Sequence, residues 1–141
     1  MKLVIDASVA LKWFLRGRPD EPDGDAALEI LRGHVEGRYA LLQPPHFLAE
    51  MCAVLARESP ATSADDLRDL LELAIPQRDD AALYARAMRL SQQLGHHLFD
   101  TLYHALALEE RDTVLVTADE RYLAKAAGQG CIVALARWTP G

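Results

Sequence analysis

Four short apolar runs, separated by longer stretches with helical spacing, constrain the fold of this chain more than any other feature. The clearest is TVLVT at 113–117, and the other three are residues 3–5, 39–43 and 131–135. Runs of this length that contain β-branched residues are typical of buried strands. Because the strands alternate with helices, we expect an α/β fold: a central parallel sheet of about four to five strands, flanked by helices on both faces.

The stretches between these runs carry apolar residues three and four positions apart, which is the spacing of amphipathic helices. They predict helices over residues 7–15, 25–35, 46–57, 63–75, 79–94, 98–110 and 118–128. Ser63 is expected to cap one of these helices, and Gly95 to end another. Residues 17–24, rich in Gly, Pro and acids, are expected to form a loop.

The length of 141 residues and a hydrophobic content of one half predict one domain spanning 1–141. No apolar run approaches the roughly 20 residues of a membrane helix. Charges at Lys2, Asp6 and Lys12 interrupt the amino terminus where a signal peptide needs an apolar stretch. We therefore expect a cytoplasmic protein.

The two cysteines and the net charge exclude little but set expectations. Cys52 and Cys131 match no zinc-ligand spacing and have apolar neighbours, so both are expected to be buried, reduced thiols. The net charge of −6 is unusual for a protein that binds nucleic acid, because phosphate contacts are mostly made by Lys and Arg. It does not exclude such a partner.

Glu50 is the sole charged residue in FLAEMCAVLA, a stretch with the spacing of a core helix. It falls at the margin of the apolar stripe, where a carboxylate is partly desolvated. An unpaired buried carboxylate costs several kcal/mol, so Glu50 should be paired, protonated, hydrogen-bonded or bound to a cation. A surface glutamate on the helix edge is the simpler alternative.

Three further acids have equally simple explanations when each is taken alone. Asp6 and Asp119 follow predicted strands and could cap the next helix, and Asp100 lies in a first helical turn where the dipole favours negative charge. Together with Glu50, however, they could converge at one sheet edge. Four carboxylates so close cannot all stay ionised without a cation, and hard oxygen ligands point to Mg²⁺ or Mn²⁺. Such a site suits phosphoryl chemistry.

Four sequence blocks in order resemble the PIN-domain ribonucleases, and among them the VapC-type toxins of prokaryotic toxin-antitoxin operons. The blocks are VIDASVALKW, QPPHFLAEMCAVL, LFDTLYHALA and LVTADERYL, and they hold Asp6, Glu50, Asp100 and Asp119 respectively. The resemblance covers nearly the whole chain. It implies a single PIN-like domain and a metal-dependent endoribonuclease with these four residues as the catalytic and metal-binding cluster around Mg²⁺ or Mn²⁺.

The resemblance also implies roles and partners. Asp6 and Asp100 would be direct or water-mediated ligands, and Glu50 and Asp119 would complete the cluster and position or deprotonate the attacking water. Ser8 and Thr117 lie where the family often has a supporting hydroxyl, although capping and strand-end hydrogen bonds explain them as well. Implied partners are RNA, a VapB-type antitoxin whose carboxy-terminal segment covers the site, and a second copy of the chain.

Some residues depart from the family pattern. Thr101 replaces a small residue, and His104 could reach the site but is better explained as a histidine bonded at a core edge. His96 and His97 are interpreted as a solvated loop in preference to a ligand pair. Arg121 could touch a phosphate or simply lie exposed on its helix.

Several other classes fit less well. A phosphatase with a nucleophilic aspartate would need a second Asp where Ser8 stands, and a receiver-type domain would need an acidic pair where Asp6 stands alone. A nucleotide-binding Rossmann domain would need a glycine-rich turn after the first strand. The serious alternative is a catalytically inactive PIN-like interaction module, for which loss of one acid would be the simplest signature.

Overall fold

The fold is an α/β sandwich in which every strand pair is parallel. The computed structural model describes residues 1–15, 18 and 22–140. Its strands are β1 (Lys2–Ile5), β2 (Ala40–Leu41), β3 (Thr113–Thr117) and β4 (Ile132–Ala134). Their order in the sheet is β2-β1-β3-β4, and β1 pairs with both β2 and β3. The expected fold class is therefore confirmed, with four strands.

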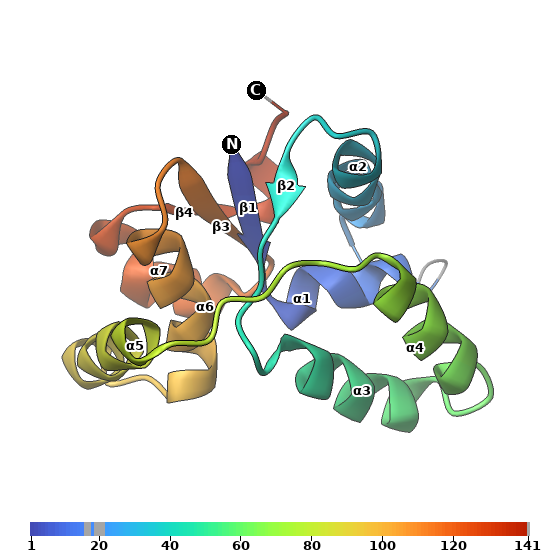
Figure 1. Ribbon diagram of the computed structural model, residues 1–141, viewed down its shortest axis with the longest axis horizontal. Helices are drawn as coiled ribbons and strands as arrows, with labels where there is room; N and C mark the ends of the chain where they lie inside the picture. Colours follow the sequence, from blue (N-terminus) through green and yellow to red (C-terminus); the bar gives the residue numbers. More distant parts are fainter. Residues whose placement is uncertain (16–17, 19–21, 141) are drawn as a thin grey trace.

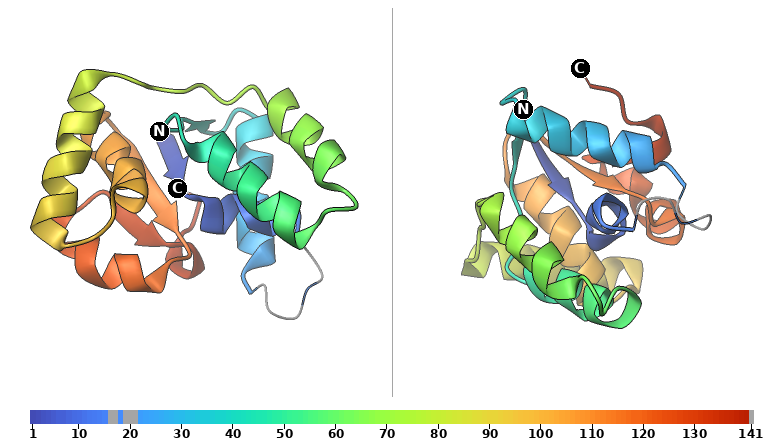
Figure 2. Two further views of the ribbon diagram at one scale, coloured as in Figure 1. Left: turned by 90° about the horizontal axis from the view of Figure 1, so that it is seen from below. Right: turned by 90° about the vertical axis from the view of Figure 1, so that its right-hand side faces the viewer.

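The described residues form seven α-helices, which lie on both sides of the sheet (Figures 1 and 2). One group, nearest β1 and β2, comprises α1 (Ala7–Ala10), α2 (Gly24–Val35), α3 (Phe47–Glu58) and α4 (Ser63–Glu72). The other group, nearest β3 and β4, comprises α5 (Ala81–Leu94), α6 (Leu98–Glu109) and α7 (Glu120–Ala126). Short 3₁₀ turns continue α1 over Leu11–Trp13 and α7 over Ala127–Gln129, and a third covers Leu135–Arg137.

The buried core explains why these segments fold as they do. In β1, Leu3, Val4 and Ile5 are fully buried, and α6 is buried along seven consecutive residues, 101–107. Helix α6 packs on both β1 and β3, and α5 covers α6 from outside. The two central strands and α6 therefore form the base from which Asp6, Asp100 and Asp119 project.

Glycine Gly33 inside α2 has a packing reason. A Cβ built there would meet the ring of Tyr39 at 2.2 Å, so only glycine lets the ring lie against the helix. The Tyr39 hydroxyl donates to the carbonyl of Glu29 at 2.8 Å. This contact fixes α2 against the start of β2.

Three expectations fail in detail. Ser63 is the first residue of α4, with Thr62 at the cap position, and its hydroxyl donates to the carbonyl of Pro60. Cys52 is half-buried, and Cys131 is exposed because it lies in a tight turn at φ 56° between Gly130 and β4. Strand β2 is only two residues long. Gly95 does end α5, in the left-handed conformation expected of it.

Part of the predicted loop at 17–24 lies outside the described residues, and its last residue, Gly24, is the first residue of α2. Within the residues that the structure describes, no helix has the length and apolar character needed to cross a membrane.

Candidate functional site

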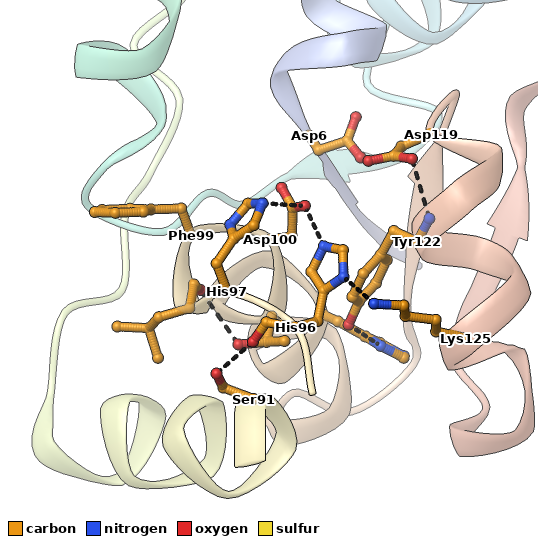
Figure 3. Close-up of polar contacts among 12 residues, drawn as sticks. Asp6, Ser91, His96, His97, Phe99, Asp100, Asp119, Tyr122 and Lys125 are labelled. Atoms are coloured by element: carbon orange, nitrogen blue, oxygen red, sulfur yellow. Dashed lines mark hydrogen bonds and ion pairs between the residues drawn. The ribbon is translucent and has the colours of Figure 1, made fainter. Parts of the chain in front are cut away.

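Asp6 and Asp119 meet at the carboxyl edge of the two central strands. Asp6 directly follows β1, Asp119 lies two residues after β3, and Ile5 pairs with Val116 in the register between these strands. The two carboxylates lie side by side (Figure 3). In open parallel sheets this edge is where ligands bind. The sheet topology thus brings together two acids that are 113 positions apart in the sequence.

The carboxylate of Asp6 accepts hydrogen bonds from two neighbouring hydroxyls and does not cap its helix. Asp6 stands at the cap position of α1, but its side chain makes no capping bond. Instead Ser8 donates to Oδ1 and Thr117 donates to Oδ2. Ser8 Oγ also accepts from the amide of Ala118 at 3.1 Å, so the hydroxyl is oriented by β3. The simpler explanation of Asp6 as a helix cap is therefore wrong.

Burial raises the pKa of Asp6 to about 6, although the hydrogen bonds from Ser8 and Thr117 act in the opposite direction. The charges of Asp100 and Asp119 make smaller contributions to this raised pKa. An ionised carboxylate in this position is costly unless a cation is nearby. Asp6 is thus the acid of the site that a bound metal ion would stabilise most.

Asp119 caps the helix that follows it, as its simpler explanation from the sequence expected, but it uses only one carboxylate oxygen to do so. Its Oδ1 accepts from the amide of Tyr122 at 3.0 Å, which caps α7. Its own amide donates to Thr117 Oγ1 at 2.9 Å, and that hydroxyl in turn donates to Asp6. Asp119 is therefore fixed in place by the same threonine that supports Asp6, while its second oxygen faces Asp6 (Figure 3).

Asp100 lies in the first turn of α6 and is held by two histidines. Its Oδ2 lies 2.6 Å from His96 Nε2 and 3.2 Å from His97 Nε2. On the far side of the His96 ring, Lys125 Nζ lies 3.2 Å from Nδ1 (Figure 3). An ammonium can only donate, so Nδ1 is an acceptor and the ring proton on Nε2 is donated to Asp100.

Glu50 is held on the opposite side of the site by groups from two segments. Tyr103 of α6 donates its hydroxyl to Glu50 Oε1 at 2.7 Å, and His46 Nε2 lies 3.1 Å from the same oxygen. Burial alone would raise the pKa of Glu50, but the hydrogen bonds from His46 and Tyr103 outweigh it and hold the pKa below its usual value. With 35% of its side chain exposed, Glu50 is an oriented, ionised carboxylate that solvent can reach.

The four acids are not equally close to one another. The charges of Asp100 and Asp119 both act on Asp6, whereas Glu50 acts together with Asp6 and Asp100 on the buried hydroxyl of Tyr103, which lies between them. Within residues 1–15, 18 and 22–140, the group of three or more possible ligands whose donor atoms all lie within 4.8 Å is His96, His97 and Asp100. Asp6, Asp100 and Asp119 offer carboxylate oxygens, the ligand type that hard divalent cations prefer, but as a trio they are not spaced within 4.8 Å of one another.

Several residues at the site were missed or misjudged from sequence. His96 is a buried partner of Asp100 with 9% of its side chain exposed, so the solvated-loop interpretation is wrong for it; His97, at 65%, is exposed. Spacings of four and three residues to Asp100 were the available signal. His46 stands four residues before Glu50 in the same way, whereas nothing in the sequence pairs Tyr103 with Glu50.

The remaining departures take no part in the carboxylate cluster. His104 is fully buried, with Nε2–H donating to the carbonyl of Gly130 at 2.7 Å and Nδ1 accepting from the Tyr122 hydroxyl at 2.8 Å. Its preferred explanation as a core-edge histidine is confirmed. Thr101 donates to the carbonyl of Ala87, and Arg121 is exposed.

A hollow of about 410 Å³ borders the cluster beyond Asp119. Its wall includes Thr117, Asp119, Glu120 and Lys12, and Lys12 is 95% buried. A buried ammonium next to a group of acids lowers the local negative potential. The wall also carries the carboxylates of Asp23, Asp119 and Glu120, so the hollow holds more acidic than basic groups.

Comparison with known proteins identifies the family. A search of curated proteins found no match. The model of the PIN domain, by contrast, matches residues 3–129, which is most of the chain and includes all four acids. The match agrees with the parallel sheet and with the position of the acids at its carboxyl edge. The chain therefore belongs to the PIN domain family.

Proposed function

We propose that this protein is a divalent-metal-dependent endoribonuclease and the toxin of a toxin-antitoxin pair. PIN domains are typically metal-dependent nucleases, so the family supports a hydrolase that acts on nucleic acid. The observation that carries the proposal is the pairing of Asp6 and Asp119 at adjacent strand ends, with the charge of Asp100 acting on the half-buried carboxylate of Asp6. The charges of Asp100 and Asp119 disfavour the ionised form of Asp6, and a shared cation would relieve this, whereas an interaction module does not require such a cluster.

Each acid has a role that its contacts support. Asp6 and Asp100 hold Mg²⁺ or Mn²⁺ directly or through water, and Asp119 completes the cluster. When bound, the cation supplies positive charge that stabilises the phosphodiester in the transition state. Glu50 is ionised and oriented by Tyr103 and His46, which is the state required of a group that positions water and accepts its proton.

The substrate is an RNA strand whose backbone passes the carboxylate cluster. Hydrolysis by attack of water leaves a 5′-phosphate and a 3′-hydroxyl. The hollow beside Asp119, whose wall combines Lys12 with several acids, is suited to a neutral ribose next to the cleaved bond. The net charge of −6 is consistent with contacts concentrated at this site, in place of a broad basic surface.

The finer assignment rests on the resemblance to VapC-type toxins. On this basis we propose that the protein is a homodimer in the cytoplasm and that the carboxy-terminal segment of a VapB-type antitoxin covers the site. Contacts with these partners are proposed for residues 17–25, part of which lies outside the described residues, and for the helices between Ser63 and Leu94. If the antitoxin binds a chain without these segments equally well, this placement is wrong.

The direct test is cleavage of total cellular RNA by purified protein free of antitoxin. Reactions contain Mg²⁺, Mn²⁺ or EDTA and are run beside Asp100→Asn. Metal-dependent products that are lost in the variant establish the nuclease. Equal products from both proteins indicate a contaminant. If defined tRNA, rRNA and mRNA substrates also stay intact, the alternative of a catalytically inactive PIN-like interaction module replaces the proposal.

A further inference from the structure

Two histidines and an aspartate form a second, nitrogen-containing ligand group beside the carboxylate cluster. His96 and His97 immediately precede α6, and Asp100 lies in its first turn. The two rings are stacked with centroids 4.6 Å apart, and both Nε2 atoms point at Asp100 (Figure 3). One ligand atom from each residue lies within 4.8 Å of the other two.

The three ligand atoms are hydrogen-bonding partners whose spacing is also close to that of ligands sharing one ion. His96 Nε2 and His97 Nε2 lie 2.6 and 3.2 Å from the same oxygen of Asp100. Ligand atoms that share a metal ion at about 2.1 Å are roughly 3 Å apart from each other. Small side-chain movements would therefore let all three atoms bind one ion, and no backbone change is needed.

The ligand types differ from those of the carboxylate cluster and select a different metal. Imidazole nitrogen suits Zn²⁺, Co²⁺, Ni²⁺ and, less strongly, Mn²⁺, whereas Mg²⁺ prefers oxygen and water. His97 is 65% exposed, so an ion and its waters can enter from solvent. His96 is almost buried and positioned, which leaves little side-chain entropy to lose on binding.

Lys125 determines how easily His96 can join such a site. Its ammonium donates to His96 Nδ1 at 3.2 Å and to the carbonyl of Gly95 at 3.4 Å. A neutral His96 bound to metal through Nε2 carries its proton on Nδ1, and that nitrogen no longer accepts from Lys125. The exposed lysine must then turn away, so it opposes metal binding.

We propose that His96, His97 and Asp100 bind a nitrogen-preferring divalent ion of the Zn²⁺ class. Because the site shares Asp100 with the carboxylate cluster, occupancy by Zn²⁺ withdraws this acid from the Mg²⁺ site. The inhibitory consequence for RNA cleavage rests on the proposed function, whereas the binding itself does not. Asp100 thus belongs to two overlapping sites that prefer different metals.

The test is calorimetric titration of the full chain, free of any histidine tag, with Zn²⁺, supported by the visible absorption bands of bound Co²⁺. His97→Ala is the main variant because the side chain is exposed and its loss leaves the fold intact. We expect His97→Ala to weaken Zn²⁺ binding by about 10-fold or more and to abolish the Co²⁺ bands. Lys125→Met should strengthen Zn²⁺ binding, and Asp119→Asn should leave it unchanged within about twofold.

Unaltered Zn²⁺ affinity in both His97→Ala and His96→Gln would overturn the inference, as would weakening by Asp119→Asn as large as that by His97→Ala. The outcome is separable from that of the proposed function. Zn²⁺ binding that depends on His97, in a protein that cuts no RNA, supports the metal site and removes the nuclease. RNA cleavage with Mg²⁺, without any binding of Zn²⁺ that depends on His97, supports the nuclease and removes the Zn²⁺ site.

Discussion

Gln43 pairs with Ile5 through its side chain as a strand residue would through its backbone. Its Nε2 donates to the Ile5 carbonyl at 2.7 Å, and its Oε1 accepts from the Ile5 amide at 3.0 Å. Gln43 is fully buried. The Gln43 side chain therefore continues the hydrogen bonding to β1 beyond the end of β2. It gives both backbone groups of Ile5, the last residue of β1, a partner immediately before Asp6.

Replacing Gln43 by Leu should destabilise the fold by roughly 2–4 kcal/mol, because two buried backbone groups of Ile5 lose their partners at about 1–3 kcal/mol each. Urea unfolding monitored by circular dichroism measures the change. Gln92→Leu, at an exposed position of α5, is the matched control and should change the free energy of unfolding by less than about 0.5 kcal/mol. Similar stabilities of the two variants would refute a structural role for the amide.

Without metal, stability should fall as the pH rises from about 4 to about 6. The pKa of Asp6 is raised to about 6 by burial, so in this range the folded state binds more protons than the unfolded state. The expected loss is on the order of 2–3 kcal/mol. Urea unfolding at several pH values should show this slope for the wild type and lose most of it for Asp6→Asn. Glu50 has a lowered pKa and acts oppositely, but below its ordinary value of 4.5.

Removal of one acid should stabilise the metal-free protein and reduce its response to metal. Asp6→Asn is expected to melt at a higher temperature than the wild type in EDTA, because repulsion from Asp100 and Asp119 is relieved. Added Mg²⁺ should raise the melting temperature of the wild type and have little effect on the variant. Differential scanning calorimetry with and without Mg²⁺ tests both. If Mg²⁺ raises both melting temperatures equally, Asp6 does not hold the metal.

Tyr103→Phe should reduce RNA cleavage while retaining the fold. The hydroxyl that donates to Glu50 is lost, so the pKa of Glu50 rises and its carboxylate is less well oriented. A loss of a supporting hydrogen bond of this kind costs roughly 10-fold in activity. Cleavage rates of an RNA oligonucleotide measure it, and Tyr84→Phe on the surface of α5 is the control. Equal rates for the two variants would show that Tyr103 acts only in packing.

Gly33→Ala should destabilise the protein although alanine is the better helix former. The new Cβ would meet the Tyr39 ring at 2.2 Å, and overpacking of this kind costs about 1–3 kcal/mol. Gly24→Ala, at the start of the same helix with nothing within 4 Å, should instead stabilise by about 0.5–1 kcal/mol. Thermal unfolding of both variants is the measurement, and a gain in both would contradict the packing of Tyr39 on α2.

The elements and the place of the acids could be predicted because each depends on local pattern and on sheet topology. The bounds predicted for the strand at 113–117 coincide with those of β3, because a buried parallel strand is apolar on both faces and stands out in the sequence. The residues that hydrogen-bond the acids were harder to predict from the sequence. His96 could have been paired with Asp100 from spacing alone, but Tyr103 and Glu50 come from different helices, and only tertiary packing brings them into contact.

The same limit applies to β2. Residues 39–43 have the apolar character of a longer strand, yet pairing ends at Leu41 because the chain turns away and Gln43 bonds with its side chain instead. The amino-acid pattern does not indicate that a side chain replaces backbone pairing at this position. Cys131 was misjudged for a related reason, because a turn at positive φ exposes a residue whose neighbours are apolar.

The pairing of β1 with β3 has a consequence for the synthesis of this chain. Thr117 and Asp119, which complete the surroundings of Asp6, leave the ribosome more than 100 residues after it. A growing chain therefore carries Asp6 without these neighbours until more than 100 further residues have been made. If the proposed ribonuclease activity is correct, this order delays it until β3 has been made and has paired with β1.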